Sequence, residues 1–190
     1  LAQRAAALKA AGLRRLNISL DPMDAAGFQR ITGLDLLDTV WQGIHEAAAV
    51  GFNPVKINCV VMRDSNEDQI VPLAELTRRH PFHVRFIEYM AIAVDPHTAR
   101  SRFVPMADVQ QRLEQLGTLM ALPSKNGDGP ARRFRFQDAP GEVGFINSMS
   151  EHFCSRCNRI RLTADVHLRP CLLADEQVSV MSALRGGAGD

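Results

Sequence analysis

The chain has 190 residues, of which 46% are hydrophobic and 23% charged, and its formal net charge is +1. This composition argues against disorder and allows one good core with a smaller appendage. The near-neutral charge argues against a broad nucleic-acid interface, and no window holds the ~20 uninterrupted apolar residues of a membrane span. Four cysteines without a secretory leader point to a reducing compartment. We therefore expect a cytoplasmic globular protein whose positive charge is local and directed at a small anion.

The first half of the chain reads as strands alternating with helices. A helix over residues 5–10 ends at Gly12, and strands are predicted over 13–21, 55–62 and 83–90 from their apolar runs and alternation. Helices are predicted over 36–50 and 66–79, the second begun by a capping box of Asn66 and Gln69. Short connections between such elements predict an α/β fold with a parallel sheet.

The predicted strands carry polar residues that a helix-covered parallel strand should not need. A parallel strand covered by helices should be mostly apolar, so we expect the other side of this sheet to line a polar site. In a βα barrel, ligands bind at the C-terminal ends of the strands. These polar strand residues are Asn17, Ser19, Lys56, Asn58, Arg85 and Glu88, and Ser19, Asp21, Glu88 and Met90 fall at the C-terminal ends.

Each of these residues also has a simpler interpretation. Asn17, Asn58 and Asp21 are residue types that also serve turns and buried hydrogen bonds. Lys56 fits an exposed edge strand, and Met90 fits a hydrophobic core. Strand composition alone leaves both interpretations open.

After residue 90 the alternation stops, at residues 95–98. A helix is predicted from Pro105 to Gly117, followed by short strands over 118–122, 132–137 and 143–147 that look antiparallel. A last helix is expected over 179–184. The second half therefore reads as a smaller α+β region.

Three cysteines near the C-terminus, Cys154, Cys157 and Cys171, have the spacing of metal ligands. A 4Fe-4S cluster held by three thiolates keeps one iron open for another ligand. Structural zinc would need a fourth donor, for which His152 or His167 is available. A disulfide and idle thiols are further alternatives.

Arg159 and Arg161 alternate beside this motif, an arrangement suited to an anionic phosphate, although solvated surface arginines would give the same pattern.

Five segments together resemble the GTP 3′,8-cyclase family of radical S-adenosylmethionine enzymes, also called molybdenum cofactor biosynthesis protein A. They comprise residues 17–21, 54–58, 85–90, 150–165 and 168–172, and the likeness extends over nearly the whole chain. The resemblance implies that residues 1–100 are the C-terminal part of a partial (βα) barrel of the radical SAM type. Residues 101–190 would then be a smaller α+β region that carries the three-cysteine cluster and binds substrate.

The resemblance also implies roles for individual residues. Cys154, Cys157 and Cys171 match ligands of a 4Fe-4S cluster whose free iron binds the guanine of GTP. Lys56, Arg159 and Arg161 match residues that hold GTP, with Ile160 between the two arginines and Arg85 as a further basic residue. Ser19 and Met90 match positions that contact S-adenosylmethionine.

The family's reaction, on this resemblance, is the radical rearrangement of GTP to 3′,8-cyclo-7,8-dihydro-GTP, the first step of molybdopterin biosynthesis. A second 4Fe-4S cluster, on a C-x₃-C-x₂-C loop, would cleave S-adenosylmethionine to start it. That loop is missing from this chain, so we expect this piece alone to be inactive, and we expect Cys59 to be a buried core thiol.

The resemblance further implies that a cyclic pyranopterin synthase acts downstream, and it is compatible with a homodimer. The chain departs from the family at Val166-His167, which replaces an expected glycine-containing turn and should stiffen or reshape the hairpin that leads to Cys171. A metal-stabilised binding module, with zinc and without catalysis, is the alternative function.

Overall fold

The computed structural model describes residues 1–90, 92, 95–123, 129–151, 154, 157 and 159–186, with the backbone alone at 96 and 182. Two compact units make up the chain, Leu1–Phe153 and Cys154–Asp190. This division differs from the boundary predicted between residues 100 and 101. The assignment of residues 1–100 and 101–190 to barrel and cluster regions stays a prediction. No helix within the described ranges is long and apolar enough to span a membrane.

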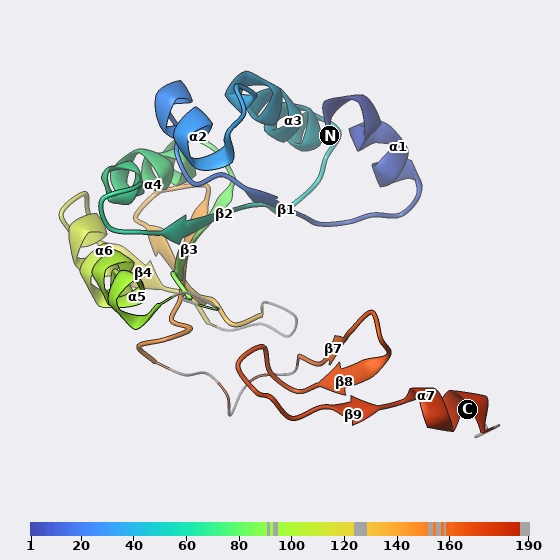
Figure 1. The fold of residues 1–190 in the computed structure, drawn as a ribbon. Helices are drawn as coiled ribbons and strands as arrows, with labels where there is room; N and C mark the ends of the chain where they lie inside the picture. Colours follow the sequence, from blue (N-terminus) through green and yellow to red (C-terminus); the bar gives the residue numbers. More distant parts are fainter. Residues whose placement is uncertain are drawn as a thin grey trace. The chain divides into compact units, whose positions relative to one another are not determined.

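The first unit is built on a six-stranded sheet with the order β1-β2-β3-β6-β5-β4 (Figure 1). The first four strands in this order are parallel, and the last two are antiparallel to their neighbours. This confirms a mixed α/β fold rich in parallel pairing, while the barrel stays a prediction. The strands are β1 (Leu16–Ser19), β2 (Val55–Val61), β3 (His83–Glu88), β4 (Leu119–Ala121), β5 (Arg132–Phe136) and β6 (Glu142–Ile146).

The strand β6 joins the two predicted halves of the chain. It pairs antiparallel with β5, as predicted, but it also pairs parallel with β3, with His83 opposite Glu142 and Phe86 opposite Phe145. The strands β4, β5 and β6 therefore extend the sheet formed by β1, β2 and β3 and do not form a sheet of their own. Hydrogen bonding along β3 is satisfied on both of its sides by this arrangement.

The helices of the first unit include two that the sequence analysis missed, α2 and α5. Each begins with an aspartate cap: Asp24 accepts a hydrogen bond from the Gly27 amide at 2.6 Å, and Asp95 accepts from the His97 amide at 3.0 Å. The helices are η1 (Ala2–Arg4), α1 (Ala5–Ala10), α2 (Ala25–Thr32), α3 (Leu37–Ala49), η2 (Glu67–Gln69), α4 (Ile70–Arg79), α5 (Pro96–Arg102) and α6 (Met106–Glu114).

The predicted capping box at Asn66 and Gln69 was wrong. The Asn66 side chain accepts from the Met62 amide and donates to the Val60 carbonyl, both at 2.8 Å, so it closes the end of β2. Gln69 Oε1 accepts from the Met23 amide at 3.0 Å. Because both side chains bind outside the helix, the helix begins with the 3₁₀ turn η2 and without a side-chain cap.

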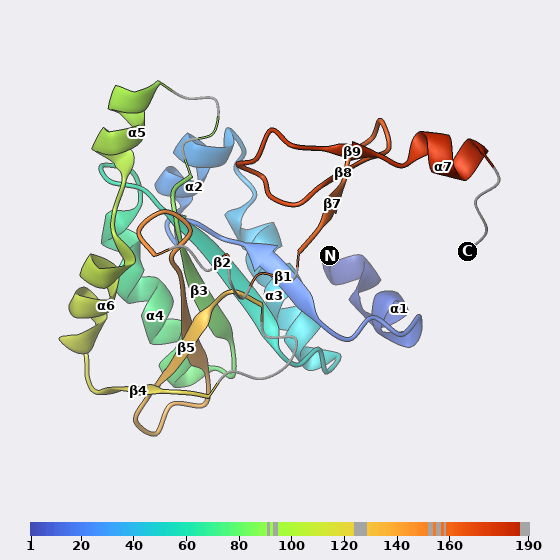
Figure 2. The ribbon, with the colours of Figure 1, turned by 90° about the horizontal axis from the view of Figure 1, so that it is seen from below.

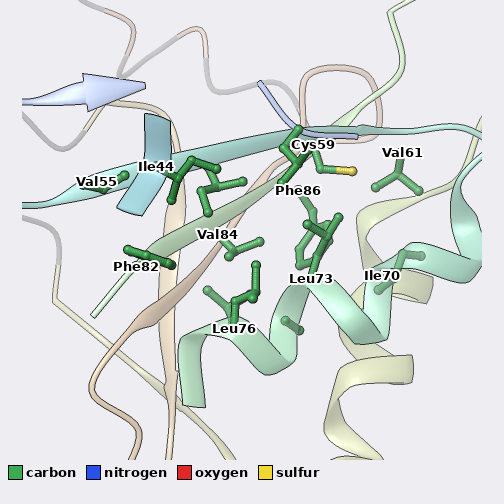
Figure 3. Close-up of a cluster of buried hydrophobic side chains, with 14 of the residues drawn as sticks. Ile44, Val55, Cys59, Val61, Ile70, Leu73, Leu76, Phe82, Val84 and Phe86 are labelled. Atoms are coloured by element: carbon green, nitrogen blue, oxygen red, sulfur yellow. The ribbon is translucent and has the colours of Figure 1, made fainter. Parts of the chain in front are cut away.

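The hydrophobic core lies between the sheet and helices α3, α4 and α6 (Figures 1 and 2). On this side the strands contribute alternate residues such as Cys59, Val84 and Phe86, each fully buried, and α4 contributes Leu73 (Figure 3). Each large apolar side chain of this kind stabilises the fold by roughly 1.5–3 kcal/mol on burial. Cys59 is 0% exposed, which confirms the prediction of a buried core thiol.

The second unit contains a small antiparallel sheet with the order β7-β8-β9. Its strands are β7 (Arg161–Leu162), β8 (His167–Arg169) and β9 (Val178–Ser179), and a short helix, α7 (Met181–Arg185), follows. The hairpin between β7 and β8 turns through Val166, whose φ is +61°. The hairpin is formed, and its turn places a β-branched residue in a region that favours glycine.

Candidate functional site

The face of the large sheet that the helices do not cover carries many polar side chains. The register of the strands arranges these polar side chains in two rows, because residues paired across neighbouring strands point to the same side, and the next row on this face, Val60, Ile87 and Ile146, is apolar. We call this surface the polar face. Its first row is Asn17, Lys56, His83 and Glu142, and its second row is Ser19, Asn58, Arg85, Gly144 and Arg133.

The polar face carries more positive than negative charge. Lys56, Arg85 and Arg133 lie in the two rows, and Arg135 lies next to them on β5. Within the rows, Glu142 is the carboxylate that opposes them. An excess of cations on a concentrated patch of this size is suited to a small polyanion.

Glu142 forms ion pairs with two of the arginines on this face. Arg133 donates to both of its carboxylate oxygens at 2.8 Å, and Arg135 Nη2 donates to Oε1 at 3.1 Å. His83 Nδ1 lies 3.5 Å from Oε2. The Glu142 side chain is 7% exposed, so this is a buried carboxylate held by bidentate arginine pairing.

His83 lies among these charged groups, and they affect its pKa. Burial lowers the pKa of His83 most, the carboxylate of Glu142 opposes that decrease, and the nearby cations Arg133, Lys56 and Arg85 lower the pKa further. The free protein therefore holds this imidazole mainly neutral at neutral pH. The side chain stays 22% exposed, so solvent reaches it.

The two predicted basic residues of the first unit, Lys56 and Arg85, both lie on the polar face. Lys56 is 7% exposed and lies on β2, between β1 and β3, so the alternative of an exposed edge lysine is wrong. Arg85 is half-buried on β3, opposite Gly144. A Cβ at Gly144 would lie 3.2 Å from Arg85 Cγ, so the glycine leaves room for the arginine side chain.

The other residues predicted at the site lie on the polar face or at the ends of the strands. Ser19 ends β1 and is exposed on the polar face, as is Asn17, whereas Met90 follows β3 and is half-buried. Asn58 lies between Ser19 and Arg85 in the second row, and its Oδ1 is buried without a hydrogen-bond partner among the described residues.

Two of the predicted polar residues, Glu88 and Asp21, make hydrogen bonds that stabilise the fold. Glu88 is 1% exposed and lies on the helix side of β3, where its carboxylate accepts from the amides of Met106, Met149 and Ser150, so its placement at a ligand site was wrong. Asp21 Oδ1 accepts from the Val60 amide at 2.8 Å and joins the end of β1 to β2. Asp21 is half-buried, and its interpretation as a hydrogen-bonding residue is confirmed.

The predicted metal ligands belong to the second unit. Cys154, Cys157 and Cys171 are free and exposed, and the Cys157 amide donates to the Cys154 carbonyl at 3.1 Å. Within the described part of the chain, no three His, Cys, Asp or Glu side chains are gathered so that they could hold a metal ion. The cluster therefore stays a prediction.

The histidines named as zinc ligands leave that alternative standing. His152 lies outside the described residues. His167 Nδ1 lies 3.0 Å from a carboxylate oxygen of Asp165 and 3.0 Å from its carbonyl, so Nε2 is the nitrogen that a metal could use. Zinc therefore stays an alternative prediction.

The two arginines of the second unit that were predicted to bind GTP are exposed. Arg159, Ile160 and Arg161 all face solvent, with Ile160 65% exposed. Arg161 on β7 pairs in register with Arg169 on β8, so two cations lie directly opposite each other. Like charges at such positions are destabilising, and a bound anion would relieve that repulsion.

His83, Arg133 and Glu142 are site residues that were not predicted from the sequence. The alternation of β3 contained a signal for His83, because it lies two residues before Arg85 and so shares its face. Glu142 and Arg133 could be found only from the pairing of β6 with β3 and β5, which the sequence pattern does not specify.

A separate open pocket of about 530 Å³ lies beside α6, lined by residues such as Gln110, Arg132 and Asn147. Arg132 pairs with Phe145, so it lies on the helix side of the sheet. This pocket is therefore distinct from the polar face and includes none of the predicted site residues.

Comparison with known proteins gives a consistent family. The family model described as Molybdenum Cofactor Synthesis C matches residues 82–190. A GTP 3′,8-cyclase of Pelotomaculum thermopropionicum is 47% identical over 190 residues, which are 100% of this chain and 58% of the relative. GTP 3′,8-cyclases of Moorella thermoacetica and Gloeobacter violaceus are 45% and 47% identical over 95% and 96% of the chain, and 56% of each relative is covered. The chain thus spans little more than half the length of these curated relatives.

Proposed function

Because the chain belongs to the Molybdenum Cofactor Synthesis C family, we propose that its complete protein is a GTP 3′,8-cyclase of molybdenum cofactor biosynthesis. The observation that carries the proposal is the polar face, on which Lys56 and Arg85 lie in adjacent rows of one sheet. Relatives with the name GTP 3′,8-cyclase align with the whole of this sheet. A radical S-adenosylmethionine mechanism is part of the proposal.

The cationic residues of the polar face support binding of a nucleotide triphosphate. Lys56 is a buried ammonium in a central strand, and a buried cation is tolerated where a partner or ligand anion compensates it. Arg85 can present a planar, bidentate donor to a phosphate. We propose that these two residues bind the phosphates of GTP, and that Arg159, Ile160 and Arg161 of the second unit also contact GTP.

The end of β1 and the residues after β3 support binding of the cosubstrate. Ser19 is exposed at the last position of β1, and Met90 lies two residues after the end of β3, so both lie at C-terminal strand ends. Ligands of parallel α/β sheets bind at these ends. We propose that Ser19 and Met90 contact S-adenosylmethionine.

The donor chemistry of the second unit fits a cluster with three protein ligands. Cys154, Cys157 and Cys171 are free, exposed thiols in one unit, and exposed arginines lie beside them. We propose that these thiolates hold a 4Fe-4S cluster, and that a further cluster is held elsewhere in the complete protein. When bound, the clusters and S-adenosylmethionine supply the radical chemistry and an open iron for the guanine base.

The residues of this chain would position the substrate. Fixing the triphosphate at Lys56 and Arg85 orients the ribose and removes much of the entropic cost of bringing the reacting atoms together. Gly144 leaves space for the Arg85 side chain on the neighbouring strand. The isolated chain lacks a second cysteine motif, so we propose that it has no activity by itself.

Metal analysis separates this proposal from a zinc-stabilised binding module. The protein expressed from its complete gene and reconstituted anaerobically should be brown, and replacement of Cys154, Cys157 or Cys171 by Ala should remove about four irons. Cys59→Ala is the matched control, since Cys59 is buried in the core and should leave the iron content unchanged. A colourless protein with one tightly held zinc would contradict the cluster and favour the binding module.

GTP binding tests the arginines independently of the metal. Arg159→Ala and Arg161→Ala are expected to weaken GTP binding by about 1.5–3 kcal/mol per lost charge-assisted contact. Both side chains are exposed, so the substitutions should leave folding intact. Unchanged GTP affinity in both variants would contradict the substrate assignment.

A further inference from the structure

We propose that His83 is a further substrate-binding residue of the polar face, and that it binds the nucleotide phosphates as an imidazolium, so that nucleotide binding takes up a proton. The inference rests on the proposed function, because it uses the polyphosphate of GTP as the anion. It adds a titratable contact to the cations Lys56 and Arg85.

The position of His83 brings it next to the proposed phosphate ligands. In the first row it lies between Lys56 on β2 and Glu142 on β6, each paired with it in register. Arg85 is two residues further along β3 and therefore on the same face. The side chain is 22% exposed, so a ligand on the polar face can reach it.

Glu142 determines which nitrogen of the imidazole is available. Its Oε2 lies 3.5 Å from Nδ1 of His83, and this favours the neutral form that carries its proton on Nδ1. Nε2 is then the nitrogen that gains the second proton. The two arginines bound to Glu142 fix the carboxylate, so this preference is built into the fold.

The charges around His83 make its protonation sensitive to an added anion. The cations that face it are Lys56 from β2, Arg85 from β3, and Arg133 and Arg135 from β5, while Glu142 from β6 is the opposing carboxylate. Without a ligand, partial burial and the cations Arg133, Lys56 and Arg85 disfavour the imidazolium. A polyphosphate that neutralises the cations reverses the balance and adds an acceptor, so a proton from solvent is taken up on binding.

Calorimetry of GTP binding to the complete protein, in buffers of different ionisation enthalpy near pH 6.5, measures this proton directly. For each GTP bound, the wild-type protein should take up about one proton more than His83→Asn. The wild type should also bind GTP more tightly than this variant, and the difference in affinity should decrease as the pH rises. Asparagine keeps a donor for Glu142 but does not titrate. The ionisation of GTP itself contributes equally to both proteins and cancels in the difference.

His80→Asn is the matched control. His80 lies three residues before His83, and its ring stacks on Phe82 at 5.0 Å, away from the two rows. This variant should show the proton uptake of the wild type. If His83→Asn does not fold, His83→Gln provides a second non-titrating variant with the same expected result.

The outcomes separate this inference from the proposed function. GTP binding with equal proton uptake in the wild type and both His83 variants would overturn the role of His83 and leave the proposed function standing. Absence of GTP binding to the folded wild-type protein would overturn the proposed function together with this inference. If His80→Asn also lost the additional proton, the uptake could not be attributed to His83, and the inference would be overturned.

Discussion

Asp21 shows how a single carboxylate can join two strands at some electrostatic cost. Its Oδ1 accepts from the Val60 amide, and its carbonyl accepts from the Cys59 thiol at 3.5 Å. Burial raises the pKa of Asp21 above its ordinary value of 3.8, and the hydrogen bond from Val60 opposes that increase. The hydrogen bond stabilises the sheet, while the desolvated charge reduces that gain at neutral pH.

The raised pKa of Asp21 predicts a definite pH dependence. The folded state binds its proton more tightly than the unfolded state, so this residue's contribution to stability is present below pH 3.8 and is lost as the pH rises through the raised folded value. Asp21→Asn keeps an acceptor for Val60 without a charge, and it should be at least as stable as the wild type at neutral pH. As the pH rises from 3.8 through the raised pKa of Asp21, the free energy of unfolding of Asp21→Asn should fall less than that of the wild type.

Asp21→Ala is the matched comparison for this prediction. It removes the acceptor and should lower the free energy of unfolding by about 0.5–1.5 kcal/mol. Urea unfolding at several pH values measures both variants. Equal destabilisation by Asn and Ala at neutral pH would show that the charge, and not the acceptor, stabilises the wild type.

The face on which a residue lies could be predicted where one strand contained the whole pattern. Lys56 and Arg85 interrupt otherwise apolar strands, so their place on a polar face could be deduced from alternation alone. Glu88 also interrupts β3, but it lies on the opposite face by the same alternation, and a helix start and a loop supply its partners. Glu142 required knowledge of which strands pair, which is a property of the folded chain.

At the scale of elements, Glu88 joins three parts of the first unit. Its Oε1 accepts from the Met106 amide at 3.1 Å, at the start of α6, where Pro105 provides no side-chain cap. Its Oε2 accepts from the amides of Met149 and Ser150 at 2.7 and 2.9 Å, and the Ser150 hydroxyl also donates to Oε1. A carboxylate at a helix N-terminus also interacts favourably with the helix dipole.

Glu88→Gln should therefore destabilise the fold. The amide group of glutamine places donors against backbone amides that are themselves donors, so we expect a loss of about 1–3 kcal/mol in the free energy of unfolding. Glu114→Gln, near the exposed end of α6, is the control and should change stability by less than about 0.5 kcal/mol. Denaturant unfolding that gives the two variants equal stability would contradict the role of Glu88 as a buried acceptor.

The β7–β8 hairpin contains a residue unsuited to its backbone. The Val166 amide donates to the Thr163 carbonyl at 3.0 Å, and Val166 then adopts φ +61° before β8 begins. A β-branched residue is strained there, whereas glycine is not. The sequence analysis expected a glycine-containing turn at this place, and the backbone of Val166 has a conformation that favours glycine.

Val166→Gly should stabilise the hairpin by about 1 kcal/mol, because it relieves the left-handed conformation. Val166→Ala is the matched control, since it shortens the side chain and leaves the strain. Hydrogen exchange of the Thr163 and His167 amides, which both bond across the hairpin, should slow in the glycine variant only. Equal exchange in the two variants would mean that the turn is not strained.

The elements themselves were predicted best where a periodic pattern was long. The helices α3 and α4 and the strands β2 and β3 appeared close to their predicted places. The short helices α2 and α5 have few turns in which periodicity can accumulate, and their aspartate caps were the available signals. The parallel pairing of β6 with β3 could not be predicted, because short strands carry no information about their neighbours.

At the scale of the whole molecule, the chain combines two features that belong to different units. The first unit has a sheet with one apolar, helix-covered face and one cationic face, and the second has three free cysteines beside exposed arginines. Together with the family match over residues 82–190, these features are the basis of the proposed cyclase. The comparison also shows that its curated relatives are considerably longer than this chain.

The most direct test of the proposed function is the conversion of GTP by the complete protein, reconstituted anaerobically and supplied with S-adenosylmethionine and a reductant. We expect consumption of GTP and formation of 3′,8-cyclo-7,8-dihydro-GTP, with a loss of about tenfold or more in kcat/KM for Lys56→Ala, which removes a phosphate contact. If the folded, metal-loaded protein leaves GTP unchanged, or if Lys56→Ala converts it as fast as the wild type, the account of the polar face as a GTP site is contradicted.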